Sequence, residues 1–229
     1  MNKGNVLVLG SKPEKEVLGI KFQKIYASNA SIEKAKIYKK IDQKIEVNAV
    51  CTHNAFLNDP TIRSRVINAK PDRLIIRKGS IQSDKELNSD CTIQCFDEIT
   101  QWDFQRNFFK FGFLTLILSE LYYGGSIKKG IVNLKNIMLK KKKLMGVSTG
   151  FFAILLAIHY NPDKNIYISG ISMRDGEHFY DLNNNPKNVN DRRKVDKFLI
   201  NFLYNKYKKR MFSNDRVFAN MANINYFVN

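Results

Sequence analysis

Short apolar runs that alternate with amphipathic stretches are the feature that most constrains the fold of this chain. Each run has the length of a strand, and turn-forming residues follow most of them. The runs expected to form strands are Asn5–Leu9, Lys24–Ala27, Glu46–Cys51, Arg73–Ile76 and Asn165–Ser169. Near-continuous apolar runs are typical of parallel strands buried on both faces, which right-handed helical crossovers connect. The sequence therefore predicts an α/β fold with a mostly parallel sheet.

Between the runs, the spacing of apolar residues predicts four helices and one long loop. The expected helices are Ser31–Asp42, Phe104–Tyr123, Gly150–His159 and Asp196–Tyr207. The third is apolar enough to be largely buried, and Ser31 is the expected N-cap of the first. Residues 173–193 are rich in Asn, Asp and Gly and have no apolar period, so we expect a flexible lid over about residues 172–195.

The length and composition fit one folded domain over residues 1–229 that has anionic partners. A chain of 229 residues with 44% hydrophobic residues can build a proper core. A net charge of +17 favours a nucleotide-sugar, an anionic membrane surface or nucleic acid; the alternative explanation is a general abundance of Lys. The apolar stretch 108–123 is interrupted by Lys110 and Glu120 and is too short to span a bilayer. We expect a soluble or peripheral protein in the cytoplasm.

The cysteines give no sign of a metal site or of a disulfide framework. Cys91 and Cys95 are close in sequence, but they have no second pair and no His nearby, and Cys51 stands alone. A reducing compartment is the natural interpretation. The chain also has no Asp-x-Asp triplet of the kind that clamps a metal-bound nucleotide, so no metal or cofactor is expected.

Four loops at the ends of expected strands, or at the start of a helix, carry the candidate binding and catalytic residues. The carboxyl edge of an open α/β sheet is where ligands bind. The four loops are Gly10-Ser11-Lys12-Pro13, Ser28-Asn29-Ala30-Ser31, Thr52-His53-Asn54 and Val147-Ser148-Thr149-Gly150. In the last loop, two hydroxyls and free N–H groups at a helix start suit a phosphate or carboxylate, although an ordinary Ser/Thr cap explains them equally well.

The block VSTGFFAILLAIHYNPDKNIYISGISM resembles the core of the bacterial lipooligosaccharide sialyltransferases. In that family a Ser/Thr-Gly pair opens a buried helix, and an IY(I/L)SGI strand follows, here Ile166–Ile171. The N-terminal strand ending at Gly10 and the closing FSNDRVFANM, a strand followed by a loop and a short helix, agree in order. The resemblance covers most of the chain, but residues 60–140 match poorly.

The resemblance implies a single Rossmann-like, GT-A-like domain with a flexible lid. It also implies inverting, metal-independent transfer of a sugar from a CMP-linked donor to a cell-surface glycan. By position, the residues that would contact this donor are Gly10, Ser11, Asn29, Asn54, Ser148, Thr149, Gly150 and Gly170.

The catalytic base is where the chain departs from the bacterial family, which places a His late in the lid. Here the stretch Gly176–Asp181 (GEHFYD) looks like the His-aromatic-aromatic-acid motif of animal-type sialyltransferases. His178 is therefore the expected base, with Glu177 or Asp181 to orient it. Tyr180 and Tyr167 would donate hydrogen bonds to the leaving CMP phosphate. His53 is the reserve candidate, and His159 is expected to be a core or helix-end residue.

The leading hypothesis is a sialyltransferase-like enzyme, with CMP-Kdo as an alternative donor that the sequence cannot distinguish. A non-catalytic, nucleotide-binding relative and a basic nucleic-acid-binding protein are further alternatives. The expected partners are a CMP-activated sugar acid and a glycan or glycolipid acceptor, and a homo-oligomer is compatible with the sequence. The run Lys140–Lys143 is either a solvated helix end or a contact with anionic lipid at the inner membrane.

Overall fold

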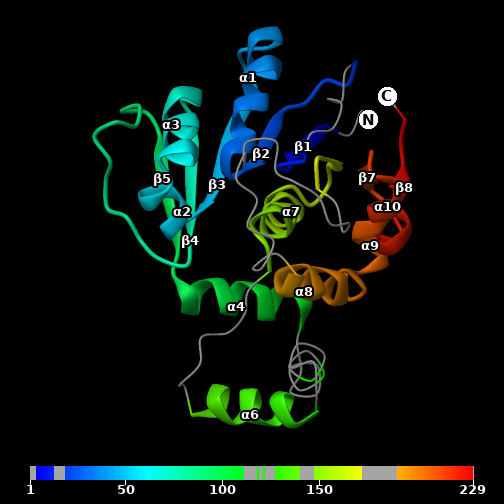
Figure 1. Ribbon diagram of the computed structural model, residues 1–229. Coiled ribbons are helices and arrows are strands. Elements are labelled where there is room, and N and C mark those ends of the chain that lie inside the picture. The colour runs from blue at the N-terminus through cyan, green and yellow to red at the C-terminus, as the bar shows by residue number, and fades with distance from the viewer. Residues whose placement is uncertain are drawn as a thin grey trace.

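A computed structural model describes residues 4–12, 19–110, 118, 121, 127–139, 147–171 and 190–228. Their centre is a single sheet of eight strands in the order β5-β4-β3-β2-β1-β6-β7-β8 (Figure 1). The strands are β1 (Asn5–Leu9), β2 (Lys24–Ser28), β3 (Glu46–Thr52), β4 (Arg73–Arg77), β5 (Thr92–Phe96), β6 (Asn165–Ser169), β7 (Met211–Ser213) and β8 (Asn225–Tyr226). Every neighbouring pair is parallel, as expected for an α/β fold of Rossmann-like type.

Helices cover both faces of the sheet, which separates two apolar core clusters (Figure 1). The 3₁₀ turn η1 (Asn29–Ser31), α1 (Ile32–Ile41), α2 (His53–Asn58) and α3 (Pro60–Ala69) pack on one face. The other cluster contains residues of α4 (Glu98–Phe109), α7 (Thr149–Tyr160), α8 (Asn190–Ile200) and α10 (Arg216–Ala222). The described ranges also contain α6 (Ile127–Met138) and α9 (Asn205–Lys208).

The buried helix predicted from the run at 150–159 is confirmed as α7, the centre of the larger core cluster. Every residue from Phe151 to Ile158 is buried, so this helix is covered on all sides rather than along one stripe. On the sheet beneath it, side chains alternate between the two faces: Val6 and Val8 face α7, whereas Leu7 and Leu9 face the opposite cluster.

Several element boundaries differ from the expectation. β5 was not predicted, because as the last strand of the sheet it buries only Phe96 and carries no apolar run. The helix expected from Phe104 begins at Glu98, capped by the Asp97 carboxylate, which accepts the Thr100 N–H at 2.7 Å. The helix expected from Asp196 begins at Asn190, so residues 190–195 of the expected lid are helical; residues 172–189 lie outside the described ranges.

Ser31 occupies the expected N-cap position of α1, but it does not cap the helix with its side chain. Its side chain makes no cap hydrogen bond, because its hydroxyl donates instead to the carbonyl oxygens of Leu9 (2.9 Å) and Ser28 (2.8 Å). The residue joins the ends of two neighbouring strands, which periodicity along one helix could not indicate.

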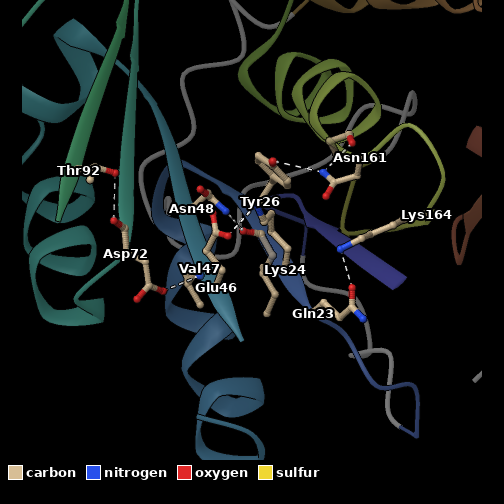
Figure 2. A network of polar contacts seen from close by, with 12 residues as sticks. Gln23, Lys24, Tyr26, Glu46, Val47, Asn48, Asp72, Thr92, Asn161 and Lys164 are labelled. Carbon is tan, nitrogen blue, oxygen red and sulfur yellow. Dashed lines mark hydrogen bonds and ion pairs between the residues drawn. The ribbon is translucent and has the colours of Figure 1, made fainter. Parts of the chain in front are cut away.

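Polar side chains at the amino ends of the strands form a structural network (Figure 2). The Asp72 carboxylate accepts the Val47 N–H at 2.7 Å and pairs with Lys39, and the Asp72 carbonyl accepts the Thr92 N–H at 3.1 Å. Asn161, at the end of α7, donates to the Tyr26 hydroxyl at 3.4 Å. These groups are engaged with one another, and open α/β sheets generally bind ligands at the opposite, carboxyl edge.

All three cysteines are free thiols. Among the described residues, no helix has the length and apolar character needed to cross a membrane.

Candidate functional site

The strand order reverses beside β1, and this switch point defines the candidate site. From β1 the chain builds the sheet outward through β2 to β5, and it then returns to add β6 against the free edge of β1. Open α/β sheets bind ligands at the carboxyl ends of the strands at such a reversal. The loops that meet here follow Leu9 of β1 and Ser169 of β6, which pair directly.

Two predicted donor-binding residues, Gly10 and Gly170, are brought into contact at this point. The Gly10 N–H donates to the Ser169 carbonyl at 2.7 Å, and the Lys12 N–H donates to the Gly170 carbonyl at 3.0 Å. A methyl group added at Gly10 would lie 2.1 Å from the Gly170 oxygen. The glycines are thus required for the close approach of the two loops. The Gly10 and Lys12 N–H groups already donate hydrogen bonds within the protein, so they are not available to a ligand. Ser11 lies between these hydrogen-bonded residues and is half-buried.

The N-terminus of α7 lies against the same loops. Gly150 is next to Ile171, because a methyl group at Gly150 would lie 3.3 Å from the Ile171 Cδ1 atom. Ser148 is the N-cap, and its hydroxyl accepts the Phe151 N–H at 3.1 Å. Within the described residues, the N–H groups of Thr149 and Gly150 donate to no acceptor, and neither does the Thr149 hydroxyl. Ser148 is thus an ordinary helix cap, which was one of the two interpretations of this loop. Thr149 and Gly150 provide the hydrogen-bond donors that an anion site needs.

Buried polar side chains from β4 and α4 fix the backbone just before this helix. The Arg77 guanidinium, 1% exposed, donates to the Gln101 side chain at 3.1 Å and to the Val147 carbonyl at 2.5 Å. The Gln105 side-chain oxygen accepts the Val147 N–H at 3.3 Å. Both backbone groups of Val147 are therefore held, and the first turn of α7 is positioned rigidly. None of these three side chains was predicted.

An acidic residue, Asp196 of α8, also reaches the start of α7. It is 4% exposed, and its carboxylate accepts the Ser148 N–H at 2.9 Å. A carboxylate at a helix N-terminus is stabilised by the helix dipole. Asp196 therefore takes one of the N–H groups expected for a ligand and leaves those of Thr149 and Gly150.

Asn29 lies at the same edge, after β2. Its backbone is left-handed (φ 52°), and within the described residues its buried side-chain oxygen accepts no hydrogen bond. The neighbouring Ser28 hydroxyl donates to the Leu9 carbonyl at 3.1 Å, so the ends of β1 and β2 are tied together beside it. Asn29 was predicted as a donor contact, and its position one strand from the switch point is compatible with that role.

His53 and Asn54 lie at the same edge but two strands from β1. They begin α2, where the Thr52 hydroxyl accepts the Ala55 N–H at 3.1 Å. The Asn54 side chain accepts a hydrogen bond from Asn58 at 2.7 Å, and the His53 ring packs against Gly79. No hydrogen bond joins these two residues to the described parts of the loops after β1 and β6, residues 10–12 and 170–171.

Tyr167 is placed away from the start of α7. It projects from β6 toward the opposite face of the sheet, where its ring stacks on Phe212 at 4.9 Å and meets the edges of Phe22 and Phe227. Its expected contact with the leaving phosphate has no support in this geometry. Alternation along the strand would have revealed this placement, because Ile166 and Ile168 face α7.

His178 and Tyr180 lie outside the described residues, as do Glu177 and Asp181. His159, expected in the core or at a helix end, is exposed at the end of α7 with its ring 5.2 Å from that of Phe104. It lines a cavity of about 890 Å³ together with Phe108, Tyr204, Tyr207 and Arg210, at the amino end of β6. This cavity is separate from the switch point.

Asn214, which follows β7, also borders the carboxyl edge and was not predicted as a site residue. Its amide donates to the Ser169 hydroxyl at 3.0 Å. The expectation that FSNDRVFANM forms a strand, a loop and a short helix is confirmed by β7, Asn214 and α10, which the Asp215 carboxylate caps.

Comparisons with protein-family models, with curated proteins and with solved structures found no match. Function must therefore be argued from the site itself. In chemical terms, the switch point offers backbone and hydroxyl donors at a rigidly held helix start, and a buried amide oxygen lies one strand away, after β2. Such a combination suits an anionic group attached to a polar ring.

Proposed function

We propose that this protein is a glycosyltransferase that uses a CMP-activated 2-keto sugar acid, of which sialic acid is the leading candidate. The observation that carries the proposal is the start of α7, where the Thr149 and Gly150 N–H groups remain without acceptors in the described part of the chain. They lie at the strand reversal between β1 and β6. The same residues carry the sequence resemblance to sialyltransferases.

The donor has negative charge on its phosphate and on its sugar carboxylate. We assign one of these groups to the Thr149 hydroxyl and the N–H groups of Thr149 and Gly150, because a helix N-terminus stabilises an anion through its dipole and its unsatisfied donors. The Asn29 side-chain oxygen is suited to accept a hydrogen bond from a hydroxyl or amino group of the ribose or base. It is buried and accepts no hydrogen bond among the described residues. The +17 net charge of the chain favours capture of such an anionic donor.

In the proposed reaction, an acceptor hydroxyl attacks the anomeric carbon of the sugar. A new carbon–oxygen bond forms to the acceptor, and the bond from that carbon to the CMP phosphate oxygen breaks with inversion. His178 would take the acceptor proton, and CMP would leave with the bonding electrons. This step needs no oxidant or reductant.

The first experiment measures CMP release from CMP-sialic acid and CMP-Kdo with purified protein, with and without EDTA, in the presence of glycan acceptors. Release from one donor that EDTA does not change would support the proposal and identify the sugar. No release from either donor by folded protein would contradict it, and retained CMP binding would then favour the non-catalytic relative.

Two sets of variants separate donor binding from proton transfer. We expect Thr149→Val and Gly150→Ala to raise the donor KM about tenfold or more. The first removes the Thr149 hydroxyl donor, and the second adds a methyl group 3.3 Å from the Ile171 Cδ1 atom, which displaces the first turn of α7; an anion contact of this kind is worth about 1.5–3 kcal/mol. His178→Ala should instead lower kcat by about 10²–10⁴, the usual contribution of a general base. Gly19→Ala is the matched control, because nothing lies within 4 Å of its added methyl group. Unchanged KM in both donor-site variants would refute the assignment of α7.

A further inference from the structure

Helix α6 exposes large apolar side chains to solvent. The exposed fractions are 73% for Ile127, 58% for Ile131, 51% for Val132 and 52% for Leu139, which follows the last turn. In Figure 1, α6 lies beyond α4 and apart from the sheet. A single exposed apolar residue needs no explanation, but four within thirteen residues form a surface with a cost in water.

These apolar side chains lie on the solvent-facing side of α6. Gly130 is buried and Leu134 is half-buried, and their spacing of four residues marks the less accessible side of the helix. Ile127 and Ile131 have the same spacing but are exposed, so they lie on the outward side. The outward apolar side chains are therefore left largely accessible by the rest of the chain.

Lysines lie among the outward apolar side chains. Lys128 and Lys135 are exposed, and their positions around the helix fall between the pair Ile127/Ile131 and the pair Val132/Leu139. Residues 127–139 contain three lysines (128, 129 and 135) and no acidic residue. An exposed surface that combines bulky apolar groups with unbalanced positive charge complements an anionic, partly apolar surface.

We propose that α6 is a docking surface for a membrane that contains anionic phospholipid. Ile127, Ile131, Val132 and Leu139 would enter the boundary between headgroups and acyl chains, while Lys128 and Lys135 contact the phosphates. Long lysine side chains can keep their ammonium groups at headgroup level while their stems lie beside apolar residues. An amphipathic helix of this kind lies in the interface plane without crossing the bilayer. The inference does not depend on the transferase activity proposed above.

The charge pattern favours lipid over a second copy of the chain as the occupant. Two copies of α6 packed face to face would bring the lysines of both helices together without any acidic residue of 127–139 to balance them. An anionic bilayer, by contrast, gains about 1 kcal/mol from each basic residue near its surface, which multiplies the affinity about fivefold per lysine.

The test is co-sedimentation of the full chain with phosphatidylcholine vesicles and with vesicles containing phosphatidylglycerol, at low and high salt. We expect binding to the anionic vesicles only, weakened by salt. Ile127→Asn/Ile131→Asn should reduce this binding about tenfold or more, because two apolar side chains no longer enter the interface. Lys128→Gln/Lys135→Gln should reduce it about tenfold or more by removing two charges.

The matched control is Ile41→Asn/Ile99→Asn, which changes two isoleucines that are each 74% exposed on α1 and α4. It should bind vesicles like the unmodified chain. Equal binding to both vesicle types, no binding at low salt, or equal loss in the control would overturn the proposal. A concentration-dependent dimer that the Ile127→Asn/Ile131→Asn variant abolishes, without vesicle binding, would assign the surface to a second copy instead.

Discussion

Replacement of Gly170 by Ala tests whether the close approach of the β1 and β6 loops builds the candidate site. Gly170 has φ +70°, and an added methyl group would lie 2.8 Å from the Gly10 oxygen and 3.1 Å from the Lys12 oxygen. The left-handed backbone costs a non-glycine residue about 1–2 kcal/mol. The crowding of two backbone oxygens, which cannot rotate away, adds about 1–3 kcal/mol.

The sum is a loss of about 2–5 kcal/mol in the free energy of unfolding, or about 4–20 °C in Tm for a chain of this size. The assay is thermal and guanidinium unfolding of the variant beside Gly19→Ala. Gly19 also has a left-handed backbone (φ +82°), but its added methyl group would meet nothing within 4 Å. Its substitution therefore isolates the backbone cost of about 1–2 kcal/mol. Equal losses in the two variants would refute the contact between the two loops.

Two further predictions concern the buried polar groups. Arg77→Met should lower the free energy of unfolding by about 2–4 kcal/mol, because it removes the donors to the Gln101 side chain and the Val147 carbonyl. Denaturant unfolding measures this loss. A loss below about 0.5 kcal/mol would contradict the role of Arg77. Burial raises the pKa of the Cys51 thiol from 9.0 to about 12, so the unfolded chain releases this proton first and stability should fall as pH rises from about 9 to about 12. Unfolding between pH 8 and pH 10.5 should show that Cys51→Ala removes a slope of up to about 1.4 kcal/mol per pH unit; an identical pH dependence in both proteins would exclude the effect.

Much of the sheet could be predicted from the sequence, because parallel strands buried on both faces leave a local signature. The runs at β1, β2, β3, β4 and β6 were each located to within a residue or so of their ends. The start of α7 was also predicted, since Ser148, Thr149 and Gly150 precede an uninterrupted apolar stretch.

The groups that hold the site in place could not be predicted, because they act across long sequence separations. Arg77 and Val147 are 70 residues apart, and Ser148 and Asp196 are 48 apart. No local pattern shows that an arginine at the end of a strand will hydrogen-bond to the backbone before a distant helix. Gly10 and Gly170 were predicted as residues that contact the sugar donor. The structure shows that a side chain at either position would collide with the backbone of the other.

The place of β1 at the centre of the sheet has a consequence for synthesis of the chain. Its two neighbours are β2, which follows within twenty residues, and β6, whose Asn165 pairs with Asn5. A ribosome adds about 5–20 residues per second, so one edge of β1 waits roughly 8–30 s for its partner. During that interval Val6 and Val8 lack the cover of α7, and an unpaired apolar edge is open to wrong partners. The nascent chain should therefore depend on chaperones until residue 169 has emerged. Pairing of β6 with the open edge of β1 then ends this vulnerable period.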